Sequence, residues 1–235
     1  MKKLIAFFTV VVIFVCFGAF ALSQNRKTDT NVSESSHTET DNNDEMKRND
    51  EETLLEIGRN DRKAYDLSSD RSLDSIYMKG ENIVIYTNEV ETIKNRHQLL
   101  GEERDGEELA VDFLLRREAI YLSAVSQGFN VSDDEVKKIL ELEREHYESR
   151  ISVNPDDFFT YLEGIGITID QYFEWQFEIK RQELIRAEYI NHEQAAFMKT
   201  NGFESWTEDN EESWQNHLQR IIDDVLEKDR VVKVS

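Results

Sequence analysis

Apolar residues recur at helical spacing over much of the C-terminal two thirds of the chain. Residues 107–127 have apolar side chains on several faces, which indicates a central, largely buried helix. Residues 133–149 carry a narrower apolar stripe formed by Val136, Ile139 and Leu140. Two further helices are predicted over residues 168–199 and 205–228. The pattern therefore predicts a mainly α, multi-helix domain.

Local capping signals separate these predicted helices. Gly128 stands where a helix can end in a left-handed residue, and Ser132 with Glu135 forms a capping box that begins the next helix. Thr168 and Gln171 repeat the capping-box pattern further along the chain. Each helix start is thus encoded within a few residues.

Two short β-branched segments bracket the helical region. They are Ile83-Val84-Ile85-Tyr86 near its start and Val231-Val232-Lys233-Val234 at the end of the chain. A lone short strand would leave backbone groups unpaired, so the two segments are expected to pair. The predicted fold is a mainly α domain with a small two-stranded β element that joins the start and end of the domain.

The N-terminal part of the chain has a different character. Residues 4–22 form an almost unbroken apolar run after Lys2-Lys3, and residues 1–24 are therefore predicted to be a signal peptide or an N-terminal membrane anchor. Cleavage is an alternative because Ala19-Phe20-Ala21 supplies a small-x-small site. Residues 25–75 are predicted to be a polar flexible tether, and residues 76–235 the folded domain. The expected location is a single-pass membrane protein with its domain on the extracytoplasmic side, or a secreted protein after cleavage.

Composition excludes some functions. The 49 acidic and 28 basic residues give a formal charge of −21, so nucleic acid is excluded as a partner because phosphate binding needs clustered cations. Cys16 is the only cysteine, which rules out an intramolecular disulfide. The five histidines are scattered, and the one in Glu143-Arg144-Glu145-His146 lacks the second histidine of a zinc helix. No catalytic residue, metal site or cofactor is predicted.

Aromatic residues are dense in two neighbouring predicted helices. The first is a short helix that begins at Asn154-Pro155 and ends at Gly164, and the second follows Thr168. The candidate binding residues are Phe158, Phe159, Tyr161, Tyr172, Phe173, Trp175, Phe177 and Ile179. On the second helix Phe173 and Phe177 share one face, while Tyr172, Trp175 and Ile179 share another. One interpretation is that both faces pack against neighbouring helices. The other is that one face stays partly open as an apolar patch for extended polypeptide segments.

The capped stretch Ser126-Gln-Gly-Phe-Asn-Val-Ser-Asp-Asp-Glu-Val136 follows the apolar helix that begins at Leu109, and Tyr161-Leu-Glu-Gly-Ile-Gly-Ile-Thr-Ile-Asp-Gln-Tyr172 forms a later turn. In this order the motifs resemble the N-terminal chaperone domain of SurA-type and PrsA-type foldases, relatives of trigger factor. The similarity covers residues 83–190 and the last helix. Members of that family hold unfolded extracytoplasmic clients through surface shape and apolar contact, so no catalytic residue carries over.

The resemblance also implies what this chain does not do. Family members with isomerase activity insert a parvulin domain before the C-terminal helix, whereas only residues 192–210 occupy that place here. The implied function is an extracytoplasmic chaperone-like protein without prolyl isomerase activity, whose partners are unfolded or newly exported polypeptides. A membrane-tethered interaction module for one dedicated envelope or secreted partner is the alternative.

Overall fold

The computed structural model describes residues 39–68, 70–101, 105–150 and 156–234. The chain divides into two compact units, residues 1–49 and Asp50–Ser235. In the first unit the described residues, 39–49, are helical. The predicted signal or anchor at residues 1–24 lies outside the described residues. Among the helices that are described, none is both long and apolar enough to span a bilayer.

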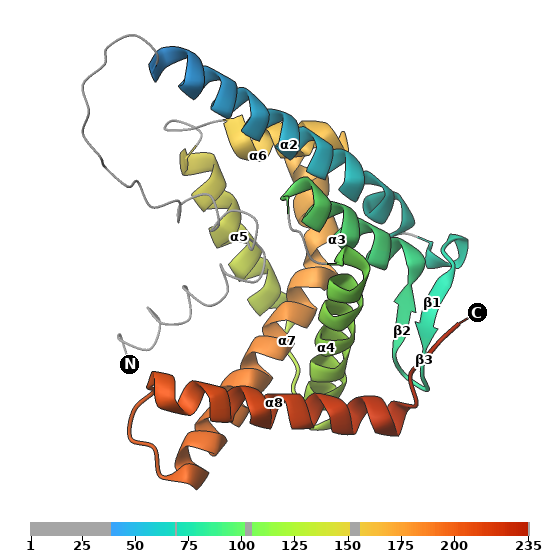
Figure 1. The fold of residues 1–235 in the computed structure, drawn as a ribbon, viewed down its shortest axis with the longest axis vertical. Coiled ribbons are helices and arrows are strands. Elements are labelled where there is room, and N and C mark those ends of the chain that lie inside the picture. Colours follow the sequence, from blue (N-terminus) through green and yellow to red (C-terminus); the bar gives the residue numbers. More distant parts are fainter. Residues whose placement is uncertain (1–38, 69, 102–104, 151–155, 235) are drawn as a thin grey trace. The chain divides into compact units, whose positions relative to one another are not determined.

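The fold is mainly α, as the sequence predicts (Figure 1). The helices are α2 (Glu39–Leu67), α3 (Thr87–Leu99), α4 (Gly106–Ser126), α5 (Asp133–Arg150), α6 (Asp156–Ile165), α7 (Ile169–Asn201) and α8 (Glu208–Asp229). A 3-10 turn, η2, covers Arg71–Leu73. The starts of α5 and α7 show the two predicted capping boxes, in which Ser132 exchanges hydrogen bonds with Glu135 and Thr168 with Gln171.

A small antiparallel sheet joins the start and the end of the second unit, and this prediction is confirmed. Its strands are β1 (Ile76–Lys79), β2 (Val84–Tyr86) and β3 (Val232–Lys233), in the order β2-β1-β3. Met78 is opposite both Ile85 and Lys233. The sheet has three strands where two were expected. The segment at 83–86, which forms β2, does not pair directly with β3, because β1 lies between them and pairs with both. The sequence of β1 gave little strand signal because it is four residues long and has one β-branched side chain.

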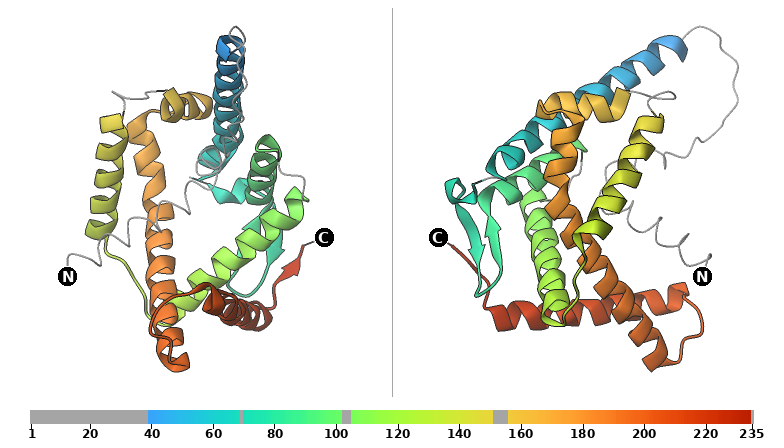
Figure 2. Two further views of the ribbon diagram at one scale, coloured as in Figure 1. Left: turned by 60° about the vertical axis from the view of Figure 1, so that its left-hand side comes forward. Right: turned by 180° about the vertical axis from the view of Figure 1, so that it is seen from behind.

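The end of α8 lies beside the turn between β1 and β2 (Figure 2, right). Asp229, the last residue of α8, fixes this turn. Its carboxylate accepts hydrogen bonds from the backbone N–H and side-chain amide of Asn82, both at 2.8 Å, and from the backbone N–H of Ile83 at 2.9 Å. Gly80 passes so close that a Cβ there would lie 2.0 Å from the Asp229 Oδ2. The C-terminal helix is therefore tied to the hairpin by a buried carboxylate.

Two apolar clusters form the core. The larger one lies between α4, α5, α7 and α8 and includes Val136, Ile185, Leu218 and Ile222. The smaller one lies under the sheet and contains Ile83, Ile85, Val90, Ala110 and Leu114. Val225 and Leu226 of α8 pack against both clusters. Residues 107–127, which form most of α4, were predicted to have a broad apolar surface, and α4 needs this surface because it contributes to both apolar clusters.

The second half of α2 belongs to the compact unit, although the sequence analysis placed the start of the folded domain at residue 76. Ile57 and Asp61 are buried, and an added Cβ on Gly58 would lie 2.8 Å from the Cα of Gly164 in α6. Gly164 was expected to end the short helix, but α6 continues to Ile165 and is followed by Gly166 in the left-handed region, with φ 74°. The absence of a side chain at Gly164 instead allows α2 and α6 to approach closely.

Candidate functional site

Six of the eight candidate binding residues come together where α6 meets α7. They are Phe158, Phe159, Tyr161, Tyr172, Phe173 and Trp175. Tyr172 is central because its ring centroid lies between 5.2 and 6.3 Å from those of four other members. Phe159 joins through Phe158, with the two ring centroids 5.9 Å apart. Most of these pairs are edge-on, the geometry that aromatic quadrupoles favour.

Two tyrosines outside the candidate residues predicted from the sequence also belong to this group. Tyr147 of α5 stacks on Phe158 with ring centroids 4.3 Å apart and an interplanar angle of 16°. Tyr65 of α2 meets Trp175 edge-on at 5.6 Å. These two rings and the six residues above are the aromatic cluster, to which α2, α5, α6 and α7 all contribute.

The members of the aromatic cluster differ in exposure. Phe173 is 8% exposed and packs with the larger core, so it is a core residue and is not available as a binding surface. Phe159 is 40% exposed on the outer side of α6. The other six rings are half-buried. The cluster is thus packed at its base by Phe173 and open to solvent at Phe159.

Phe177 and Ile179 do not join the aromatic cluster through ring contacts. Phe177 lies under the guanidinium of Arg181, which is 5.1 Å from the ring centroid and also pairs with Asp133 of α5 at 2.7 Å. Ile179 is exposed. The predicted helical faces account for this only in part. They separate Phe177 from Tyr172, but they also group Phe173 with Phe177, whereas the Phe173 ring contacts that of Tyr172.

A buried carboxylate lies beside the aromatic cluster. Asp61 of α2 accepts a hydrogen bond from the Tyr161 hydroxyl at 2.8 Å and from Arg96 of α3 at 2.6 Å. Burial, and then the charge of Asp61, raise the pKa of the Tyr161 phenol well above its usual value. Tyr161 therefore stays a neutral donor, and three helices meet at a charged group that is 2% exposed.

The helices around the aromatic cluster are linked by further polar contacts. Lys180 of α7 is buried and pairs with Glu143 of α5 at 2.9 Å and with Glu183 at 2.8 Å. Arg62 of α2 donates to the carbonyl oxygens of Ile165 and Gly166 at the end of α6. These bonds satisfy carbonyl groups that a helix C-terminus leaves without a partner. The geometry of α6 thus depends on α2.

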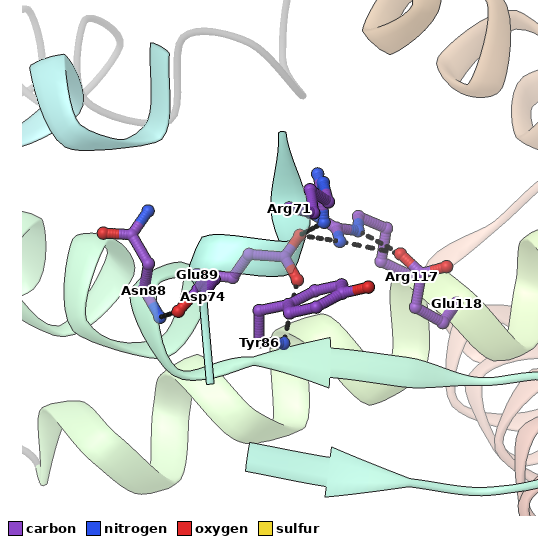
Figure 3. Close-up of polar contacts among 7 residues, drawn as sticks. All are labelled: Arg71, Asp74, Tyr86, Asn88, Glu89, Arg117 and Glu118. Atoms are coloured by element: carbon purple, nitrogen blue, oxygen red, sulfur yellow. Dashed lines mark hydrogen bonds and ion pairs between the residues drawn. The ribbon is translucent and has the colours of Figure 1, made fainter. Parts of the chain in front are cut away.

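A second polar group lies at the start of α3 and has a structural role (Figure 3). Glu89 accepts from the backbone N–H of Tyr86 and pairs with Arg71 and Arg117 at 3.3 and 2.9 Å. Arg117 also pairs with Glu118. Burial lowers the pKa of Arg117, but the two carboxylates outweigh it, and the net shift is upward. Every acid in this group has a basic or backbone partner, so the contacts fix α3 against β2 and α4.

Within the residues described, no group of three or more His, Cys, Asp or Glu side chains is placed to hold a metal ion. The candidate site is the aromatic cluster, whose chemistry is apolar contact and cation–π attraction. Comparison with protein-family models, with curated proteins and with solved structures gave no match to this chain.

Proposed function

We propose that this protein binds extended segments of unfolded or newly exported polypeptide at the aromatic cluster and keeps them from aggregating, without isomerising them. The observation that carries the proposal is the incomplete burial of the cluster. Seven of its eight rings are half-buried or exposed, although four helices converge on them. Large aromatic side chains that stay partly accessible in one place are typical of interaction sites.

The surroundings of Phe159 suit a surface that must bind apolar segments and stay soluble. Glu163 follows one helical turn after Phe159 on the exposed side of α6. The whole chain has a formal charge of −21, which keeps complexes apart by repulsion. An apolar contact with an acidic rim captures a client segment and limits further association.

The resemblance of the capped helix pair to SurA-type and PrsA-type foldases supports the same proposal, as does the apolar N-terminal run. We place the domain on the extracytoplasmic side of the membrane, attached by residues 1–24 or released after cleavage. The membrane is then a partner only through the N-terminal segment.

A dedicated interaction module for one envelope or secreted partner is a second candidate. The packing of Trp175 between Tyr65 and Tyr172 favours it, because a general client surface needs accessible rings. Such a partner would contact mainly Phe159 and the adjoining exposed turn of α6.

Light scattering of an aggregating client tests the proposal. We expect the full chain in phospholipid nanodiscs to suppress aggregation of a chemically unfolded protein diluted from denaturant, at near-equal molar ratios. Phe159→Ser is expected to weaken this suppression. Phe113→Ser is the matched control, since Phe113 is 46% exposed on α4 and is not part of the aromatic cluster. No suppression by the wild type would favour the dedicated module, and equal loss in both variants would exclude the cluster as the site.

A further inference from the structure

The second half of α2, from Asp50 to Leu67, is attached to the rest of the unit by a narrow stripe. Of residues 51–67, only Ile57, Gly58 and Asp61 are buried. Tyr65 continues this stripe, because the spacing from Ile57 to Asp61 and from Asp61 to Tyr65 is one helical turn each. Figure 1 shows this half of α2 passing along α6 and α3. Ile57 is its one fully buried large apolar side chain, and Leu54, Leu55 and Tyr65 are only half-buried, so burial stabilises this half of α2 less than the helices that form the two core clusters.

The polar contacts of the stripe fix the position of α2 but add little to the free energy that holds it there. Asp61 pairs with Arg96 and Tyr161, but taking a carboxylate out of water carries a desolvation cost that offsets much of this attraction. Arg62 is half-exposed, and so are its bonds to the end of α6. The attachment is geometrically defined and energetically modest.

The same stripe covers part of the candidate site. Asp61 binds the hydroxyl of Tyr161, and Tyr65 lies edge-on against Trp175. We propose that residues 50–67 form a strap whose Tyr65 takes the place of a client against the other rings of the aromatic cluster, and that a client segment displaces this strap. This inference rests on the proposed function, since it concerns the regulation of that same site.

The strap also defines the kind of segment that fits its place. Gly58, Asp61 and Tyr65 put a small residue, a carboxylate and an aromatic ring at positions i, i+3 and i+7 of a helix. They meet the backbone at Gly164, the Tyr161–Arg96 pair and the Trp175 ring respectively. A client segment is therefore expected to compete with the strap by placing an aromatic ring against Trp175, as Tyr65 does.

The test measures client affinity when the strap is weakened. The full chain in nanodiscs is titrated into a fluorescently labelled, permanently unfolded protein, such as reduced and amidomethylated lysozyme, and anisotropy is read. Because apparent affinity scales with the fraction of molecules whose site is open, Tyr65→Ser is expected to tighten binding by about three- to tenfold. The control Glu52→Ala changes an exposed residue of the same helix and is expected to leave affinity unchanged. Hydrogen exchange of residues 53–67 in the wild type is expected to accelerate when the client is added.

The outcomes separate the two proposals. The strap is overturned if Tyr65→Ser weakens client binding or leaves it unchanged and if hydrogen exchange in residues 53–67 does not accelerate. The proposed function then remains in place. If neither the wild type nor Tyr65→Ser binds the client, both the strap and the proposed function are overturned. Tighter binding by Tyr65→Ser together with faster exchange in the strap supports both.

Discussion

The buried carboxylate of Asp229 allows a quantitative test of how the N-terminal hairpin and the C-terminal helix hold together. Asp229→Ala removes an acceptor of three hydrogen bonds, two from Asn82 and one from the backbone N–H of Ile83. Asn82 is exposed, so water can replace its two bonds, and their loss costs about 0.5–1.5 kcal/mol each. Ile83 is 3% exposed, and leaving its N–H without a partner costs about 1–3 kcal/mol. These losses sum to about 2–6 kcal/mol, so we expect the unfolding free energy to fall by about 4 kcal/mol.

Urea unfolding followed by far-UV circular dichroism measures this change. Asp224→Ala, an exposed carboxylate on the same helix, is the control and is expected to change stability by less than about 0.5 kcal/mol. The close approach of Gly80 adds a second check, because Gly80→Ala is expected to cost less in the Asp229→Ala background than in the wild type. A loss below about 1 kcal/mol in Asp229→Ala, or strict additivity with Gly80→Ala, would show that Asp229 does not hold the hairpin to α8.

Two further predictions concern stability. Arg230 follows α8 with φ 56°, in the left-handed region. Arg230→Gly is therefore expected to raise the unfolding free energy, measured by urea titration, by about 1 kcal/mol. A decrease would show that the arginine side chain compensates for the strain. Because the pKa of Tyr161 is raised in the folded state, its contribution to stability is complete below the unfolded-state pKa of about 10 and is lost as pH rises above it. Unfolding free energies measured between pH 8 and pH 11 are expected to fall with pH in the wild type and to fall less steeply in Tyr161→Phe, and equal slopes would contradict this.

Much of the fold is predictable because its signals are local. The capping boxes at Ser132 and Thr168 and the apolar spacing placed α4, α5 and α8 within a few residues of their observed bounds. These signals depend on side chains that interact with their own helix. The helix after Thr168 likewise begins where its cap predicts.

The parts that were missed depend on contacts between distant segments. The contact stripe of α2 contains a glycine and a carboxylate in place of apolar residues, so hydropathy gave no sign that Ile57, Gly58 and Asp61 are buried. Asp229 pairs with a turn that is 146 and 147 residues away in the sequence. Neither contact has a signature within its own segment.

In the candidate site too, local features were predictable from the sequence and contacts between distant segments were not. The aromatic residues that are dense in α6 and the first turns of α7 do come together, but helical spacing did not identify the members of the cluster, because it grouped Phe173 with Phe177 and Ile179 with Tyr172. Sequence spacing could not show that Phe173 faces the core, or that Tyr65 and Tyr147 complete the cluster. Tyr147 shares the inward side of α5 with Val136 and Leu140, which is the one signal that was available.

The most direct test of client binding at the aromatic cluster is site-specific photo-crosslinking. A photoreactive phenylalanine analogue replaces Phe159 in one variant of the full chain and Phe113 in the other, and each is irradiated with the unfolded lysozyme client. We expect client adducts from position 159 that a folded lysozyme does not give, and few or none from position 113. Equal adducts from both positions, or none from position 159 while the client is bound, would contradict this expectation.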